Sequence, residues 1–324
     1  MKKRNKWIAV ISVLVGLTVI GGYGGIRYLF DYAIVRDEKD FMSSGDASGT
    51  SEPAKPYEKW TFLNTKPKYM TQKTEDGLTL KGVYLRNNEQ KVQGNRKLMI
   101  LVHGYTSNGK LLEQYAKLFY GKGYDLFLPD ARAHGMSEGK YIGFGWPDRI
   151  DLLHWIKQMI AYYDDKVDIG LWGISMGGAE VMMVSGEKLP KQVKCIIEDC
   201  GYSSTKEEME YQLKEMFHLP SFPIIPLASA YTEHRVGYNF YESSAVEQLK
   251  KNHLPMLFIH GSKDDFVPTE MVEEVYEASK GPKEKVIFPG AGHAKSYQSN
   301  PKRYEKVVFQ FLDQYLPVKE KSKK

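Results

Sequence analysis

The chain has 324 residues, of which 42% are hydrophobic and 26% charged, so it can bury a sizeable core. Its two cysteines are too few to hold such a chain together by disulfides, and no Cys/His group has the spacing of a zinc site. The first six residues carry four positive charges and the last six a net +3; subtracting both from the total of +5 leaves −2 for the rest. A near-neutral body makes a nucleic-acid-binding face improbable.

A long stretch without charge near the start of the chain is typical of a membrane-spanning helix. No charged residue occurs from Trp7 to Ile26, and about 20 helical residues, at about 1.5 Å each, span the roughly 30 Å of a bilayer core. Three aromatic residues stand where interfacial side chains are expected, namely Tyr23, Tyr28 and Phe30. We therefore predict a transmembrane anchor over residues 7–30.

The charges around this stretch predict its orientation. The cations of residues 1–6 would stay in the cytoplasm, which places the rest of the chain outside the cell, held at the cell membrane by a single span. A cleaved signal peptide, which would release a secreted protein, is the alternative, although no A-x-A site follows the apolar stretch. Residues 31–59 are polar and lack an apolar period, so they are predicted to be a flexible linker.

Residues 60–318 are predicted to fold as one domain, followed by a basic tail at 319–324. An antiparallel pair of strands is expected around the turn dipeptide Asp76-Gly77, and after it short apolar runs alternate with helical periodicity. We expect strands at 97–102, 124–128, 167–172, 193–197, 256–259 and 285–288, and helices at 108–122, 147–163, after residue 175, and from 269 and 302. This alternation predicts an α/β fold, a mostly parallel twisted sheet with helices on both faces. Residues 203–250, with three prolines, break the rhythm and are interpreted as a lid.

A candidate nucleophile lies in the sequence Gly173-Ile174-Ser175-Met176-Gly177, which follows a predicted strand and precedes a predicted helix. A serine on such a sharp turn has an exposed hydroxyl, and the flanking glycines leave room for the neighbouring backbone. The N-terminus of the helix behind it stabilises negative charge. The five-letter pattern also occurs by chance, so this strand–turn–helix context is what indicates a nucleophile.

A serine hydroxyl is a weak nucleophile at neutral pH and needs a base with a carboxylate behind it. His293 follows a predicted strand on a glycine-rich loop, and Asp264 follows another strand, so both are expected at the carboxyl edge of the sheet. Asp265 and Asp199 are the alternatives for the carboxylate if Asp264 is only a turn residue.

Charge that develops on a substrate oxygen needs fixed hydrogen-bond donors. The backbone N–H of Met176, directly after the serine, is one expected donor. The other is the N–H of Tyr105, in the loop after the strand at 97–102. His103 lies beside this loop, and we expect it to make a structural hydrogen bond rather than to act as the base.

In this order the motifs resemble those of the α/β-hydrolase superfamily. The resemblance covers residues 66–316 and rests on LVHGYTSN, PDARAHGMSEG, LWGISMGG, IHGSKDDFVP and GAGH. The chain looks most like the monoglyceride-lipase-like and serine-aminopeptidase-like branch, and its lid resembles those of bacterial membrane-anchored acyl esterases. The resemblance implies a triad of Ser175, Asp264 and His293, and a structural role for His134.

The same resemblance implies a serine hydrolase that cleaves esters, thioesters or amides with no cofactor. Its substrate is expected to be a small or lipid-like acyl compound, and no metal or protein partner is predicted. A carboxylesterase is preferred over a serine aminopeptidase, because no acidic group for a free amine is identified in the sequence. A non-catalytic envelope binding protein on the same fold is the alternative of another class. The apolar residues of the lid either pack it onto the sheet or line an acyl-chain pocket; they are Phe217, Leu219, Phe222, Ile224, Ile225, Leu227 and Tyr231.

Overall fold

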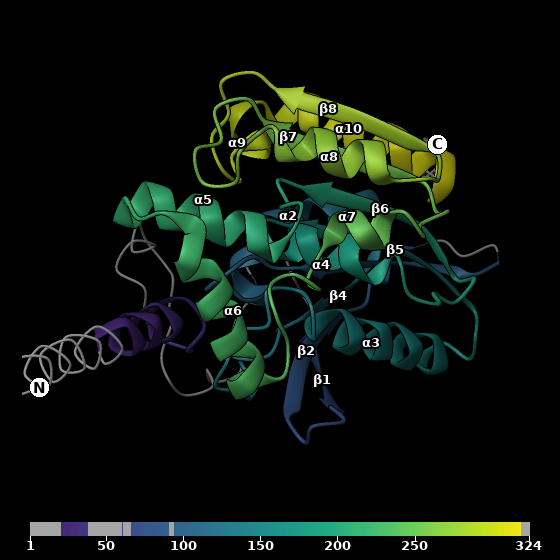
Figure 1. The fold of residues 1–324 in the computed structure, drawn as a ribbon. Helices are drawn as coiled ribbons and strands as arrows, with labels where there is room; N and C mark the ends of the chain where they lie inside the picture. Colours follow the sequence, from purple (N-terminus) through teal and green to yellow (C-terminus); the bar gives the residue numbers. More distant parts are fainter. Residues whose placement is uncertain (1–20, 38–59, 61–65, 91–93, 319–324) are drawn as a thin grey trace, which may run out of the picture.

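The computed structural model describes residues 21–37, 60, 66–90 and 94–318. The basic N-terminus, most of the predicted anchor, most of the predicted linker and the basic tail lie outside the described residues. Within the described part, no helix combines the length and the apolar character needed to cross a membrane. The folded domain has a central sheet with helices on both sides (Figure 1).

Eight strands form one sheet in the order β1-β2-β4-β3-β5-β6-β7-β8. They are β1 Lys68–Lys73, β2 Thr79–Leu85, β3 Arg96–Val102, β4 Asp125–Pro129, β5 Val167–Ile174, β6 Val193–Asp199, β7 Met256–Gly261 and β8 Lys283–Phe288. β2 pairs antiparallel with β1 and β4, and all other pairs are parallel. The predicted, mostly parallel sheet is confirmed, and the carboxyl ends of β3 to β8 therefore share one edge.

Helices cover both faces of this sheet. They are α2 Glu113–Lys122, α3 Asp148–Tyr162, α4 Met176–Val184, α5 Thr205–Phe217, α6 Ser221–Val236, α7 Ala245–Leu249, α8 Met271–Ala278, α9 Ser296–Ser299 and α10 Pro301–Tyr315, with a 3-10 turn, Gly109–Leu112, before α2. Strand β3 shows how the layers form: Leu98 and Ile100 join the core under α3 and α4, whereas Met99 and Leu101 join the core under α2 and α10. Alternate side chains of a strand point to opposite faces of the sheet. Because both faces are buried here, the sequence of β3 is a continuous apolar run.

The region predicted as a lid contains α5, α6 and α7. Ser204 and Ser244 cap α5 and α7, accepting hydrogen bonds from the backbone N–H groups three residues on. These two serines also pair in an antiparallel bridge. The chain therefore leaves the sheet and returns to it at one place, and α5 and α6 extend from there toward the N-terminal helix (Figure 1).

The first described residues pack against this lid. Residues 21–33 are helical, and Phe30 and Ile34 are 3% and 1% exposed. The ring of Phe30 lies 5.1 Å from that of Tyr231 on α6. The prediction that Phe30 lies at a lipid interface is therefore wrong, because its apolar surroundings are protein.

The chain after this helix is also attached to the domain. Val35 pairs with Tyr141 in an antiparallel bridge. The guanidinium of Arg36 donates hydrogen bonds to the carbonyl oxygens of Ser137 and Gly135, at 2.6 and 2.8 Å. The prediction that a flexible linker begins at residue 31 is therefore wrong for residues 31–36, because their backbone and side-chain donors find partners on the domain. Residues 38–59 of that linker lie outside the described residues.

Candidate active site

Ser175 lies between the end of β5 and the first residue of α4, at the carboxyl edge of the sheet. Its φ of 56° and ψ of −122° are strained for a residue that has a Cβ. The flanking glycines make this turn possible. A Cβ on Gly173 would lie 2.1 Å from the carbonyl oxygen of Gly177, and one on Gly177 would lie 2.3 Å from that of Val102.

The structure brings the three predicted side chains together in one hydrogen-bonded series. Oγ of Ser175 lies 2.8 Å from Nε2 of His293, and Nδ1 of His293 lies 2.8 Å from Oδ2 of Asp264. Burial alone would raise the pKa of Asp264, but hydrogen bonds from His260 and His293 outweigh it and hold that pKa below its usual range. The carboxylate is ionised at neutral pH and accepts the Nδ1 proton, which leaves Nε2 of the neutral ring to accept the serine hydroxyl.

A fourth side chain, not predicted from the sequence, holds Asp264 from behind. His260 is fully buried at the end of β7, and its Nε2 lies 3.3 Å from Oδ2 of Asp264 and 3.0 Å from the carbonyl oxygen of Val267. A carbonyl oxygen only accepts, so Nε2 carries the proton. The other oxygen of Asp264 accepts the N–H groups of Phe266 and Val267, at 3.0 and 2.9 Å. A polar residue inside the apolar strand MLFIHG was the available signal.

The two alternative carboxylates lie elsewhere. Asp265 is exposed, and its backbone oxygen accepts the hydroxyl of Tyr211 at 3.0 Å. Asp199 is buried at the end of β6, where Oδ2 accepts the hydroxyl of Tyr304 at 2.8 Å. Of the three candidates, Asp264 is the one that hydrogen-bonds His293.

The two expected oxyanion donors belong to segments that flank Ser175. Met176 is the first residue of α4, and the first N–H groups of a helix have no acceptor within it. Tyr105 follows β3, and the backbone just before it comes close to the nucleophile. A Cβ on Gly104 would lie 3.2 Å from Cβ of Ser175. Both segments therefore lie beside the serine.

His103 and His134 hold loops rather than reacting atoms. Nε2 of His103 accepts the N–H of Ala131 at 3.0 Å, and Nε2 of His134 accepts the N–H of Thr106 at 3.1 Å. Each Nδ1 lies within 2.9 Å of a backbone carbonyl oxygen, to which it donates. Burial lowers both pKa values, that of His134 to about 3. Both rings are therefore neutral and tie the loop after β3 to the loop after β4.

Among the described residues, Cys200, Asp264 and His293 have potential metal ligands within 4.8 Å of one another. Burial, with nearby carboxylates, raises the pKa of the Cys200 thiol well above its usual range. A thiol that stays protonated is a poor metal ligand. Asp264 and His293 are already hydrogen-bonded to each other, so this group is better suited to proton transfer than to metal binding.

Comparison with known proteins assigns the chain to a family. It is 33% identical over 215 residues to the uncharacterized protein YqkD of Bacillus subtilis (strain 168), a match that covers 66% of this chain and 70% of that protein. The prolyl oligopeptidase family model, Peptidase_S9, matches residues 143–319, which include Ser175, Asp264 and His293. The chain belongs to the prolyl oligopeptidase family.

Solved structures share the fold of this prolyl oligopeptidase family member. The esterase Pf2001 of Pyrococcus furiosus aligns with a TM-score of 0.64 at 24% identity, covering 82% of this chain and 98% of that one. The acylaminoacyl peptidase of Pyrococcus horikoshii aligns with a TM-score of 0.59 at 20% identity, covering 80% of this chain and 43% of that one. At these identities the likeness concerns the fold, and the expected membership of the α/β-hydrolase superfamily is confirmed.

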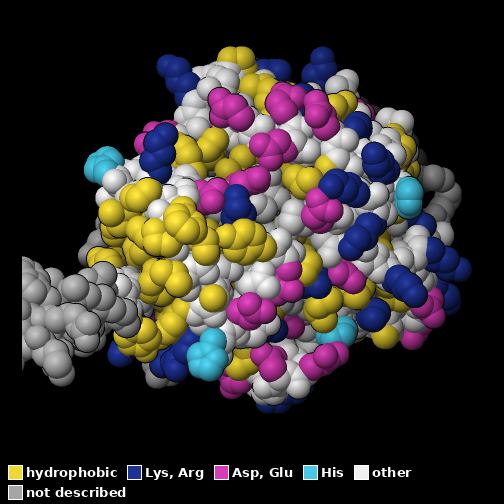
Figure 2. All heavy atoms as spheres, viewed as in Figure 1, with side chains coloured by type: hydrophobic (Ala, Val, Ile, Leu, Met, Phe, Trp, Pro, Cys, Tyr) yellow, Lys and Arg dark blue, Asp and Glu magenta, His cyan; other side chains and the backbone are white. Residues whose placement is uncertain are grey.

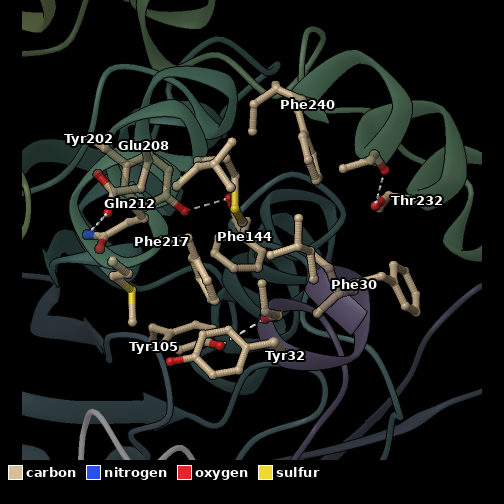
Figure 3. A pocket seen from close by; sticks show the side chains of 18 of the residues that line it. Phe30, Tyr32, Tyr105, Phe144, Tyr202, Glu208, Gln212, Phe217, Thr232 and Phe240 are labelled. Atoms are coloured by element: carbon tan, nitrogen blue, oxygen red, sulfur yellow. Dashed lines mark hydrogen bonds between the residues drawn. The ribbon is translucent and has the colours of Figure 1, made fainter. Parts of the chain in front are cut away.

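In this prolyl oligopeptidase family member, Ser175 opens onto an apolar pocket under the lid. The pocket holds about 900 Å³ of empty space, its open mouth included. Figure 3 shows several of the aromatic residues that line this space, from the N-terminal helix, the domain and the lid; among them are Tyr32, Tyr105, Phe144 and Phe217. The apolar lining suits an uncharged organic ligand.

Only some of the apolar residues of the lid take one of the two expected roles. Phe217, Ile224 and Ile225 line the pocket. Three others face outward and are 40%, 78% and 53% exposed; they are Leu219, Phe222 and Leu227. Tyr23 and Tyr28 of the N-terminal helix are similarly exposed. Figure 2 shows hydrophobic side chains gathered on the surface beside the start of the described chain.

One acidic side chain lines the pocket within the described part of the chain, and it was not predicted from the sequence. Oε1 of Glu208, on α5, accepts a hydrogen bond from Gln212 at 2.9 Å, whereas Oε2 is buried without a hydrogen-bond partner among the described residues. Burial raises the pKa of Glu208 to about 8, so the group is largely uncharged at neutral pH. Glu208 shares the buried face of α5 with Thr205 and Leu213. In the sequence, Glu208 therefore occupies a position where the helical period predicts an apolar residue, and this was the signal that could have identified it.

Glu208→Gln is expected to stabilise the fold, relative to the wild type, more at about pH 8 than at about pH 5. The pKa of Glu208 is about 8 in the folded chain against an ordinary 4.5, so between these values the folded state keeps a proton that the unfolded state loses. Wild-type stability therefore falls as the pH rises through this window, and glutamine, which does not ionise, removes this contribution. Thermal unfolding of both proteins across the window measures the difference.

The matched control is Glu215→Gln, because Glu215 is exposed on the same helix. The gain expected of Glu208→Gln at higher pH is assigned to burial, so it is not expected in this exposed control. If Glu208→Gln differed from the wild type by a constant amount, the side chain would be ionised in the folded protein and the assignment would be wrong.

Proposed function

We propose that this chain is a serine carboxylesterase that cleaves esters of uncharged aliphatic acyl groups through an acyl-enzyme. The observation that carries the proposal is the hydrogen-bonded series of Ser175, His293 and Asp264, whose serine lines an apolar pocket. Burying a charged acyl group against such a lining would be costly, whereas a hydrocarbon chain gains from leaving water.

In the first step, Nε2 of His293 takes the hydroxyl proton of Ser175 as Oγ attacks the ester carbonyl carbon. Asp264 holds the ring in the required tautomer and stabilises the imidazolium. The imidazolium then gives its proton to the leaving alcohol, and an acyl-serine remains. A water molecule, deprotonated by the same nitrogen, releases the carboxylic acid and restores the serine.

The negative charge on the carbonyl oxygen during both steps is assigned to two backbone donors, the N–H groups of Met176 and Tyr105. The strained φ and ψ of Ser175 turn its hydroxyl out of the sheet edge, beside the start of α4. The positive end of that helix favours the oxyanion further.

A serine aminopeptidase is the second candidate, and Glu208 is the observation that favours it. A carboxylate in the pocket could pair with the free amine of an aminoacyl substrate. The raised pKa of Glu208 argues against this, because an uncharged carboxyl group attracts an ammonium group weakly. The ester is therefore the preferred substrate class.

Rates of hydrolysis of p-nitrophenyl esters from acetate to decanoate, beside aminoacyl p-nitroanilides, test this choice. Turnover of the esters and none of the anilides is expected. Turnover of an anilide without turnover of any ester would reverse the choice, and turnover of neither, with no labelling by a fluorophosphonate, would favour a non-catalytic binding protein.

We also propose that the chain is held at the cell membrane through the uncharged stretch that precedes Arg27, with its N-terminus inside. The absence of charge from Trp7 to Ile26 supports this, as do the exposed apolar side chains beside the start of the described chain (Figure 2). Secretion after cleavage is the alternative. Recovery of the intact chain in the cytosolic fraction would exclude both.

A further inference from the structure

The N-terminal helix presents one apolar face to the domain. Ile26, Phe30 and Ile34 recur every four residues and are 8%, 3% and 1% exposed. Residues four apart lie on the same side of a helix. Arg27 and Asp31, each one position further on, pair with each other at 3.6 Å while largely exposed. The helix therefore has one orientation on the domain, with its charges turned to solvent.

This face is joined to the lid and to the loop beside the nucleophile. The ring of Tyr32 lies 5.4 Å from that of Phe217 at the end of α5, in an edge-to-face arrangement. The hydroxyl of Tyr105 donates a hydrogen bond of 2.8 Å to the carbonyl oxygen of Ala33. Tyr105 is the residue whose backbone N–H is assigned to the oxyanion. The helix thus contacts both the cover of the pocket and the segment that flanks Ser175.

The same residues form one wall of the pocket onto which Ser175 opens. Five consecutive or nearly consecutive residues of this segment line it; they are Leu29, Phe30, Tyr32, Ala33 and Ile34. Figure 3 shows the ring of Tyr32 beside Tyr105 and below Phe217 of the lid, whereas the ring of Phe30 lies on the other side of the N-terminal helix. Without this helix the apolar space would open to solvent on that side, so the site is incomplete without the N-terminal segment.

The geometry points to residues 29–34 as the part of the substrate site that sets acyl-chain length, for esters of aliphatic acids longer than acetate. This inference rests on the proposed function. An acyl chain attached to Ser175 leaves water by lying between the lid and the helix, and each further methylene gains binding until it meets a side chain of the wall. The segment that follows the proposed membrane anchor is then part of the substrate site.

Two substitutions with opposite effects test it. Ala33→Phe adds a ring to the wall, and the ratio of kcat/KM for p-nitrophenyl octanoate to that for the acetate is expected to fall about tenfold or more. Leu29→Ala removes a side chain from the wall. The ratio of kcat/KM for p-nitrophenyl decanoate to that for the octanoate is therefore expected to rise. A general loss of folding would lower all rates together and would not shift the two preferences in opposite directions.

Tyr23→Ala is the matched control, because Tyr23 is on the same helix, is 57% exposed and does not line the pocket. Its ratios are expected to equal those of the wild type. Unchanged ratios in both wall variants, or an equal shift in Tyr23→Ala, would overturn the inference.

A binding measurement separates this inference from the proposed function. The fluorescence of cis-parinaric acid, an aliphatic acid, reports binding to an apolar site without turnover. Each protein that is compared also carries Ser175→Ala, so that no hydrolysis occurs. Weaker binding with Ala33→Phe, and wild-type binding with Tyr23→Ala, would support the wall whether or not any ester is hydrolysed. Hydrolysis of esters together with equal binding in all variants would retain the esterase and overturn the wall.

Discussion

Replacing Ser175 with alanine is expected to abolish labelling by a fluorophosphonate and to lower kcat for p-nitrophenyl esters by roughly 10³ to 10⁶-fold. The reason is that Oγ of Ser175 is the only serine oxygen that the described structure places on Nε2 of His293, at 2.8 Å. Without it no acyl-enzyme forms, and only binding and oxyanion stabilisation remain. Burst kinetics and labelling followed by mass spectrometry measure the loss.

The fold is expected to survive this change, because the variant removes one oxygen and leaves the backbone of the turn as it is. The thermal unfolding midpoint checks this. Ser299→Ala is the matched control, since Ser299 is an exposed serine of α9 whose hydroxyl bonds only a nearby carbonyl. Wild-type turnover in Ser175→Ala would exclude the nucleophile and with it the proposed mechanism.

Asp264→Asn is expected to lower kcat by about 10⁴-fold while leaving the protein folded. The one oxygen left on the substituted side chain would keep the hydrogen bonds from the N–H groups of Phe266 and Val267, so the new amide nitrogen would face His293. An amide donor opposite Nδ1 favours the tautomer whose proton is on Nε2, and that nitrogen no longer accepts the serine proton. Steady-state rates with the ester that the wild type cleaves best measure the effect.

Two further asparagine variants identify which carboxylate acts. Asp265→Asn changes an exposed neighbour, and Asp199→Asn changes a buried carboxylate that accepts the hydroxyl of Tyr304. Asp265→Asn is expected to retain wild-type rates, and Asp199→Asn to affect unfolding more than catalysis. Full activity of Asp264→Asn, or a loss of similar size in either neighbour, would show that the acid is assigned incorrectly.

The N-terminal segment shows where prediction from the sequence reaches its limit. An apolar stretch without charge indicates only that its side chains avoid water, and it does not distinguish lipid from protein as the environment. Phe30 was assigned to the lipid interface, yet it packs against Tyr231 of the lid. The contact joins residues about 200 positions apart, and no periodicity within the helix reports on such a partner.

The buried polar side chains around the site show the same limit. Glu208, Asp199 and His260 are each preceded or followed by apolar residues, and each is buried in the domain. Which of them points into the pocket, and which contacts Asp264, depends on where the whole fold places α5 and β7. For that reason Asp265 and Asp199 remained alternatives to Asp264 as the acid for His293, and Glu208 was not recognised.

What the sequence by itself determined were the features that depend on near neighbours. In β3, alternate side chains point to opposite faces of the sheet, and this follows from the two-residue period of a strand. The turn at Gly77 and the strand–turn–helix at Ser175 depend on the conformations and the space that glycine allows. Both effects act over a few residues. The order of the motifs also indicated Ser175, Asp264 and His293 as partners. Only the tertiary structure decided the 2.8 Å contacts of His293, the protonation of Glu208 and the place of the N-terminal helix in the pocket wall. These depend on burial and on the pairing of distant segments, which the whole fold creates.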